Sequence, residues 1–137
     1  MIVADTSAVI ALLDRDERHH GVIKALFARD AEPWLLPWAT LPEVDYLAAQ
    51  RMGARVHALW MDDLTDGTYH VHWGNDEDLE HARKIQKKYQ SLNLGLVDAI
   101  VMAVAEGVRA TAIVTLDLRH FGAVELKGAP KLYPRDL

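Results

Sequence analysis

The sequence opens with MIVADTSAVIALL, residues 1–13, and this stretch decides the fold. Residues 1–4 are apolar, too few for a helix, and half of them are β-branched, which favours a short buried strand. The apolar run 8–13 has helical length and follows polar residues suited to capping. Asp5 therefore lies where a strand gives way to a helix, the place where open α/β sheets bind ligands. An ordinary N-cap explains Asp5 equally well at this point.

Length and composition indicate one cytoplasmic globular domain over residues 1–137. Hydrophobic residues make up 50% of the chain, and there is no cysteine, which excludes disulfides and thiolate metal sites. No apolar run approaches the ~20 residues that span a membrane, and the start lacks the basic segment of a signal peptide. The net charge of −5 argues against a general basic surface for nucleic acid. It leaves open a nuclease whose acidic site holds metal.

Helical and extended patterns alternate along the rest of the chain. Helices are predicted over 16–29, 40–53, 54–64, 75–88 and 96–107, and strands over 33–37, 68–73, 111–114 and around 132–133. This alternation predicts an α/β fold, a three-layer α/β/α sandwich with a short, mainly parallel central sheet.

Three more carboxylates occupy places like that of Asp5. Glu43 stands at a helix start, where a capping box with Thr40 would also explain it. Asp117 follows the strand 111–114, as Asp5 follows the first strand. Asp98 lies in an apolar helix with no Lys or Arg within four residues, so its charge is costly unless it is hydrogen-bonded, paired or metal-bound. An N-terminal cap is the structural alternative for Asp98.

The ends of parallel strands gather at one edge of a sheet, so these four carboxylates are expected to meet there. They would repel one another unless a proton or a cation joined them. Oxygen ligands select hard cations such as magnesium, which also binds substrate phosphate. One or two such ions could activate water for phosphodiester hydrolysis. The pair His70 and His72 could chelate zinc, but the sequence indicates no third ligand.

These motifs resemble those of the PIN-domain family, and most closely the VapC-type toxins of bacterial toxin–antitoxin pairs. The resemblance rests on DTS at 5–7, Glu43, LGLVDA at 94–99 and TLDLRHF at 115–121, and it follows the whole chain in order. It implies a magnesium- or manganese-dependent endoribonuclease that cleaves RNA with metal-activated water. It also implies a cognate antitoxin that inhibits the enzyme, and a homodimer.

The resemblance assigns roles to particular residues. The residues that would hold the metal and catalyse are Asp5, Glu43, Asp98 and Asp117, and those that would support them through hydrogen bonds are Thr6, Ser7 and Thr115. Some relatives carry a further acid where this chain has Arg119, which could instead contact phosphate. The basic helix face with Lys84, Lys87 and Lys88 is either a solvated surface or a track for phosphates.

Rival functions fit the residues less well. A haloacid-dehalogenase phosphatase needs a second Asp two residues after the first, where Ser7 stands. A phospho-accepting receiver needs a second early acid and a late strand-end lysine, and neither is evident. A catalytically silent PIN-like interaction module is the other alternative, against which the presence of all four acids argues. Trp34 and Trp38 are candidate exposed anchors for the antitoxin, with burial in the core as the alternative.

Overall fold

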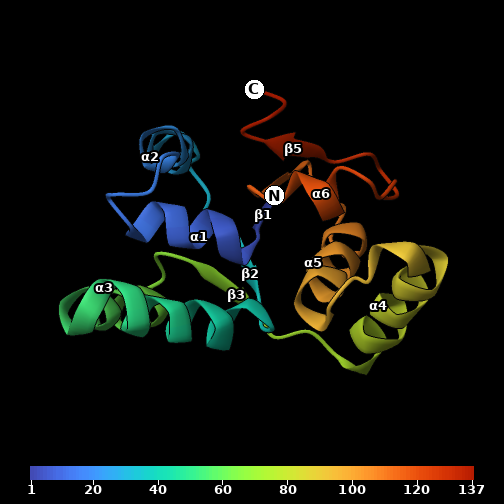
Figure 1. Ribbon diagram of the computed structural model, residues 1–137, viewed down its shortest axis with the longest axis horizontal. Coiled ribbons are helices and arrows are strands. Elements are labelled where there is room, and N and C mark those ends of the chain that lie inside the picture. Colours follow the sequence, from blue (N-terminus) through green and yellow to red (C-terminus); the bar gives the residue numbers. More distant parts are fainter.

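The computed structural model describes residues 1–137 as a parallel five-stranded sheet with helices on both faces (Figure 1). The strands are β1 (Ile2–Ala4), β2 (Leu35–Pro37), β3 (His70–His72), β4 (Ala112–Val114) and β5 (Lys131–Tyr133), in the order β3-β2-β1-β4-β5. All four strand pairs are parallel. The predicted α/β sandwich is confirmed.

The sheet separates two apolar cores. The helices are α1 (Thr6–Leu13), α2 (His20–Arg29), α3 (Thr40–Thr65), α4 (Asp76–Lys88), α5 (Leu96–Gly107) and α6 (Leu118–Phe121). Val3 and Ile113 point to the core under α4 and α5, whereas their neighbours Ala4 and Val114 point to the core under α1, α2 and α3. This alternation is the two-residue period of a strand buried on both faces.

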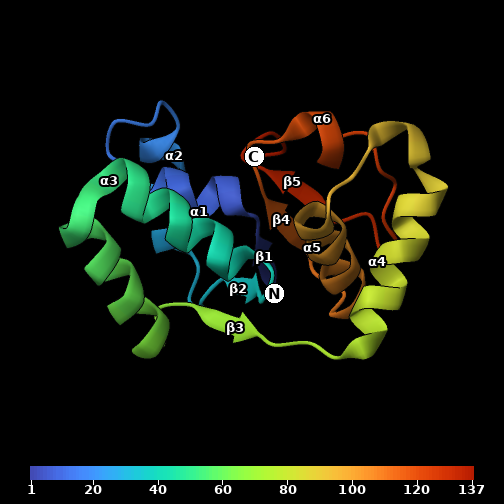
Figure 2. The same ribbon diagram turned by 60° about the horizontal axis from the view of Figure 1, so that its bottom comes forward.

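The sheet order places β1 at the point where the chain changes direction. From β1 the chain first adds β2 and β3 on one side, and later β4 and β5 on the other (Figure 2). Ligands of open α/β sheets bind outside the carboxyl ends of the strands at such a switch point. The residues that follow β1 and β4 are therefore the ones that the fold presents for a site.

Two expectations about the helices need adjustment. The second helix begins at His20 rather than at residue 16, because residues 15–19 form turns. Gly53 does interrupt the third helix, with φ 83° and ψ 176°, although helical hydrogen bonding resumes at once and α3 continues to Thr65. None of the helices is long and apolar enough to cross a membrane.

The tryptophans are distributed differently from the prediction. Trp34 is fully buried and packs edge-on against Phe27, with ring centroids 4.9 Å apart, so its role as an exposed anchor is wrong. The reason is that β2 lies between β1 and β3 and is covered on both faces. Trp38 is half-buried. The exposed tryptophan is Trp73, which lies beyond the end of β3 with 72% of its surface accessible.

Gly53 allows a direct test of the break in α3. Its backbone lies in a region that is nearly restricted to glycine, although a Cβ there would meet no atom within 4 Å. Gly53→Ala should therefore lower the free energy of unfolding by about 1–3 kcal/mol in urea denaturation. Gly21→Ala is the matched control, because Gly21 is helical and equally uncrowded, and it should stabilise the protein by about 0.4–1 kcal/mol. Equal effects of the two substitutions would contradict the strained conformation.

Candidate active site

Asp5 is held at the switch point of the sheet by its own backbone. It follows β1 directly, and its N–H donates to the carbonyl of Val114 over 3.0 Å, which extends the pairing of β1 with β4 by one residue. Asp5 is also the N-cap of α1, so both of its sequence-based interpretations describe its position. Only 3% of its surface is accessible.

The Asp5 carboxylate accepts three hydrogen bonds. The N–H of Thr6 donates to Oδ1 over 2.7 Å, and the hydroxyls of Ser7 and Thr115 donate to Oδ2 over 3.0 and 2.8 Å. The same two hydroxyls accept the N–H groups of Leu116 and Asp117, over 2.9 and 3.0 Å. Ser7 and Thr115 thus tie the segment after β1 to the segment after β4.

Burial raises the pKa of the Asp5 carboxyl, whereas these three hydrogen bonds lower it. The pKa of Asp5 is raised to about 6, chiefly by loss of hydration and partly by the negative charge of Asp98, while the donors from Thr115, Ser7 and Thr6 oppose the shift. Ionised Asp5 therefore destabilises the folded protein, and a cation close to the carboxylate would offset this cost in free energy.

Asp117 and Asp98 meet around a histidine that was missed in the sequence. Asp117 is the N-cap of α6, and its Oδ1 accepts the N–H of His120 over 3.2 Å. The ring Nδ1 of His120 lies 3.0 Å from Oδ2 of Asp98 and 3.1 Å from Oδ2 of Asp117. The spacing could have indicated this contact, because residues three apart share one face of a helical turn.

The surroundings of Asp98 also raise its pKa. Burial is the largest cause, and the negative charges of Asp117 and Glu43 add to it, while the hydrogen bond and positive charge of His120 act in the opposite direction. The pKa of Asp98 thus depends on its proximity to the carboxylates of Asp117 and Glu43, which come from other parts of the chain.

Capping does not account for Asp98 or Glu43. The N-cap of α5 is Gly95, and no side chain caps that helix. The N-cap of α3 is Ala39, again without a side-chain cap, and the hydroxyl of Thr40 donates to the carbonyl of Pro37 over 2.8 Å. The predicted capping box is therefore wrong, because Thr40 lies inside the helix. Glu43 is exposed and makes no hydrogen bond or ion pair.

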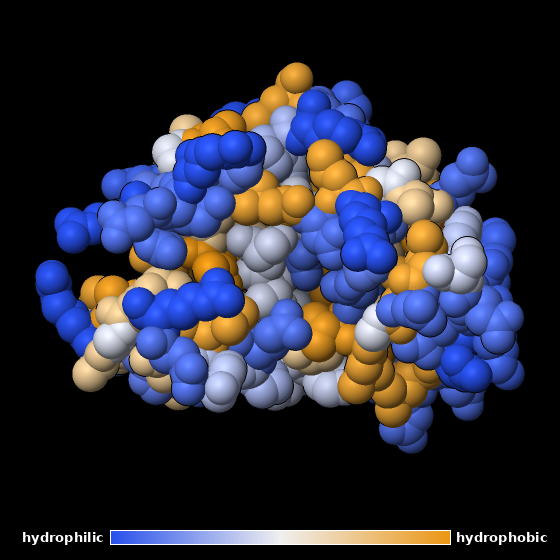
Figure 3. Space-filling model, viewed as in Figure 1, coloured by the Kyte–Doolittle hydropathy of each residue, from blue (hydrophilic) through white to orange (hydrophobic).

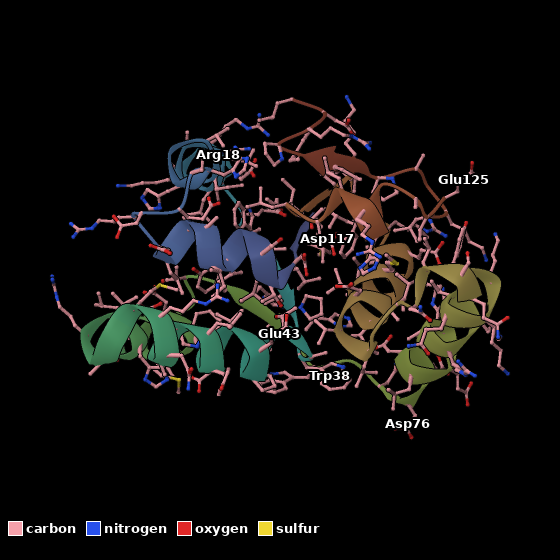
Figure 4. The ribbon with its side chains drawn as sticks, viewed as in Figure 1. Arg18, Trp38, Glu43, Asp76, Asp117 and Glu125 are labelled. Carbon is pink, nitrogen blue, oxygen red and sulfur yellow. The ribbon has the colours of Figure 1, made fainter.

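One pocket of about 340 Å³ collects the four predicted carboxylates. Asp5, Glu43, Asp98 and Asp117 all line it, together with Ser7 and Arg51. In Figure 4 Glu43 lies at the end of α3 that faces α5, and Asp117 lies above it, between α1 and α5. In Figure 3 hydrophilic and hydrophobic residues are mixed over this face, with no single apolar patch on it.

A divalent cation fits this donor set. Asp98, Asp117 and His120 each offer one ligand atom, and these three atoms lie within 4.8 Å of one another. Carboxylate oxygens are the ligands of magnesium and manganese, and imidazole is also used for transition metals. No group of three potential ligands includes His70 or His72.

The remaining predicted residues fall into two groups. Thr6 supports Asp5 through its backbone N–H, whereas its hydroxyl is buried without a partner. The basic side chains Arg119, Lys84, Lys87 and Lys88 are exposed and do not line the pocket. The three lysines belong to α4, which packs on α5 on the side away from α1 in Figures 1 and 2. Their contacts with RNA stay a prediction.

Known proteins share both the sequence pattern and the fold. Residues 2–126 match the PIN domain family. Ribonuclease VapC26 of Mycobacterium tuberculosis is 30% identical over 123 residues, which cover 90% of this chain and 91% of that protein.

Two solved structures, both below 25% identity, have the same fold. Mycobacterium tuberculosis VapC20, a sarcin-ricin loop cleaving toxin, matches with a TM-score of 0.82 at 21% identity, over 93% of this chain and 98% of that one. A toxin–antitoxin complex from Klebsiella pneumoniae matches with a TM-score of 0.71 at 19% identity, over 90% and 92% of the two chains. The chain belongs to the PIN-domain family, and within it to the VapC toxin ribonucleases.

Proposed function

We propose that this chain hydrolyses phosphodiester bonds in RNA with the help of magnesium or manganese, as the toxin of a type II toxin–antitoxin pair. The observation that carries the proposal is the single pocket lined by carboxylates from four separate parts of the chain. The relationship to Ribonuclease VapC26 supports RNA as the substrate class.

Asp5, Asp98 and Asp117 would hold the ion, with His120 beside the last two. When bound, a divalent ion lowers the pKa of a water molecule and neutralises charge on the phosphate. The residues around it act by fixing the carboxylates. Ser7 and Thr115 hold Oδ2 of Asp5, and the N–H of His120 holds Oδ1 of Asp117.

Glu43 is assigned a different role, that of proton acceptor for the attacking water. The other three carboxylates are held by hydrogen bonds or by His120, whereas Glu43 has no partner and remains exposed at the first turn of α3. A carboxylate that is free to turn can receive a proton from water in the pocket and release it to solvent.

Phosphoryl transfer through Asp5 is disfavoured by its geometry. A nucleophilic carboxylate needs an oxygen that can approach phosphorus. Both oxygens of Asp5 accept hydrogen bonds and the residue is 3% exposed, which leaves little room for the approach of a tetrahedral phosphorus, whereas an ion in the pocket needs only one remaining lone pair. Asp5 is therefore unsuited to be the phosphate-accepting aspartate that a phosphatase or a receiver domain needs.

An antitoxin has a suitable surface next to the pocket. A groove of about 440 Å³ between α1 and α3 is lined by Leu12, Leu13 and Met52 and shares Arg51 with the acidic pocket. A partner segment in this groove could extend an Arg or Lys to the carboxylates and exclude the metal. The proposal also includes a homodimer, for which exposed Tyr46 and Met61 on α3 are candidate contacts.

The antitoxin should be encoded beside this gene, and its purified product should bind the protein and abolish RNA cleavage. The stoichiometry and the loss of activity can be followed by titration with gel filtration. Failure of that protein to bind or inhibit would remove the toxin–antitoxin part of the proposal and leave the nuclease part standing.

The carboxylates should act as one unit, so that their losses are not additive. Asp98→Asn should nearly abolish magnesium-dependent cleavage of total RNA, and adding Asp5→Asn should reduce the residual rate little further. Glu43→Gln should also lose cleavage but retain magnesium binding in calorimetry, because Glu43 accepts a proton rather than holding the ion. Near-normal cleavage by folded Asp98→Asn would refute the assignment of the site.

Without metal, the protein should become less stable as the pH rises from 5 to 7. The pKa of Asp5 is about 6 in the folded protein and near 3.8 when unfolded, so the folded state binds more protons across this window. The resulting loss from Asp5 is on the order of 1 kcal/mol, so the decrease in stability should be clearly smaller in Asp5→Asn, where the raised pKa of Asp98 still contributes.

At pH 7 magnesium should make the unsubstituted protein more stable than its Asp98→Asn variant. For a dissociation constant of ~1 mM, ~10 mM magnesium should stabilise the protein by roughly 1.4 kcal/mol through mass action. Thermal melts with EDTA and with magnesium measure both effects. In EDTA, Asp98→Asn should be at least as stable as the unsubstituted protein, and it should lose most of the stabilisation by magnesium. Identical melting temperatures in all four conditions would contradict a buried carboxylate site for metal.

A further inference from the structure

Arg51 is the cationic side chain of a pocket that is otherwise strongly acidic. The residues around this pocket include five carboxylates, contributed by Asp5, Glu17, Glu43, Asp98 and Asp117, and one cation, Arg51. RNA is a polyanion, so every carboxylate that is not neutralised opposes its entry. The positively charged guanidinium of Arg51 attracts a phosphate that enters the pocket.

The helix α3 directs Arg51 toward the acidic residues. Glu43, Leu47 and Arg51 follow one another at intervals of four residues, and all three line the pocket. Arg51 follows Glu43 by eight positions, which corresponds to about 12 Å along the helix axis. Glu43 and Arg51 therefore line the same pocket from one face of α3.

No protein group neutralises Arg51. The arginines that form ion pairs within 4.0 Å are Arg29 and Arg135, each with the aspartate that follows it in sequence. Arg51 is exposed, and it makes no side-chain hydrogen bond even though five carboxylates line the same pocket. Its donors are therefore available to a ligand, and a planar guanidinium matches two oxygens of a phosphate.

We infer that Arg51 binds a backbone phosphate of the RNA next to the scissile one and thereby positions the strand in the pocket. The inference rests on the proposed ribonuclease function. The scissile phosphate is assigned to the carboxylates. Arg51 lies two helical turns from Glu43, so the phosphate that it contacts is a neighbouring one. Arg51 is a positioning residue in this assignment and takes no part in proton transfer.

The test compares Arg51→Gln and Arg51→Lys with Arg55→Gln. Arg55 lies one turn further along α3 and lines the neighbouring groove but not the acidic pocket, which makes it a matched control. With a short single-stranded RNA, Arg51→Gln should raise KM about tenfold, the low end for a hydrogen bond to a charged group, and leave kcat within about twofold. Arg51→Lys should recover most of the loss, and Arg55→Gln should behave like the unsubstituted protein.

A second readout does not depend on cleavage. In the Asp98→Asn background, RNA binding is measured as a function of salt, and loss of one phosphate contact should reduce the slope of log Kd against log salt by about 0.7. An unchanged KM and slope in Arg51→Gln, while the unsubstituted protein cleaves RNA, would overturn the role of Arg51 alone. A loss of antitoxin binding with unchanged RNA kinetics would overturn it as well. If the unsubstituted protein failed to cleave RNA with magnesium, the proposed function itself would fail.

Discussion

The burial of Asp5 and Asp98 close to other negative charges, beside the carboxyl end of β1, is the constraint on which the surrounding structure depends. The pKa of both Asp5 and Asp98 is raised, in each case chiefly by burial and partly by neighbouring negative charge. The chain offers no lysine or arginine in contact with these groups, and instead surrounds them with hydroxyls, backbone N–H groups and one imidazole. Such donors fix the direction of the carboxylates while leaving room for a cation from solution.

The strands β1 and β4, which precede the site, are only three residues long. Their pairing alone therefore holds the residues of the site weakly in place. Hydrogen bonds beyond the strand ends extend the sheet to the residues of the candidate site. Asp5 N–H donates to Val114, and Thr115 N–H donates to the carbonyl of Tyr133 over 2.9 Å. The hydroxyl of Thr115 then links Asp5 to the backbone of Asp117. Fold and site therefore share the same few interactions, which explains why Ser and Thr accompany the acids.

Sequence patterns predicted the order of strands and helices and the four carboxylates, because each depends on local periodicity and on strand ends. Other features depend on tertiary packing. Trp34 is buried because β2 is an inner strand, whereas the edge strand β3 leaves Trp73 exposed. Arg51 lies two turns after Glu43 on α3, and the packing of α3 against α1 brings it to the same pocket as the aspartates that follow β1 and β4. His120 lay within a recognised motif, but its contact with Asp98 required the packing of α6 beside α5.

An acidic nuclease must attract a polyanion despite its own net charge of −5. At physiological salt the Debye length is about 8 Å, so distant carboxylates are screened and the nearest charges dominate. In the proposed complex, the charges around the RNA in the pocket are the carboxylates, which a divalent ion would neutralise, and Arg51, which has no ion-pair partner in the protein. Binding then depends on a few local contacts rather than on a basic surface. With the proposed ion, such an arrangement would couple RNA entry to metal occupancy, since the carboxylates alone repel phosphate. It also makes the pocket easy to silence, because a partner that supplies one cation can satisfy the carboxylates and block the RNA at the same time.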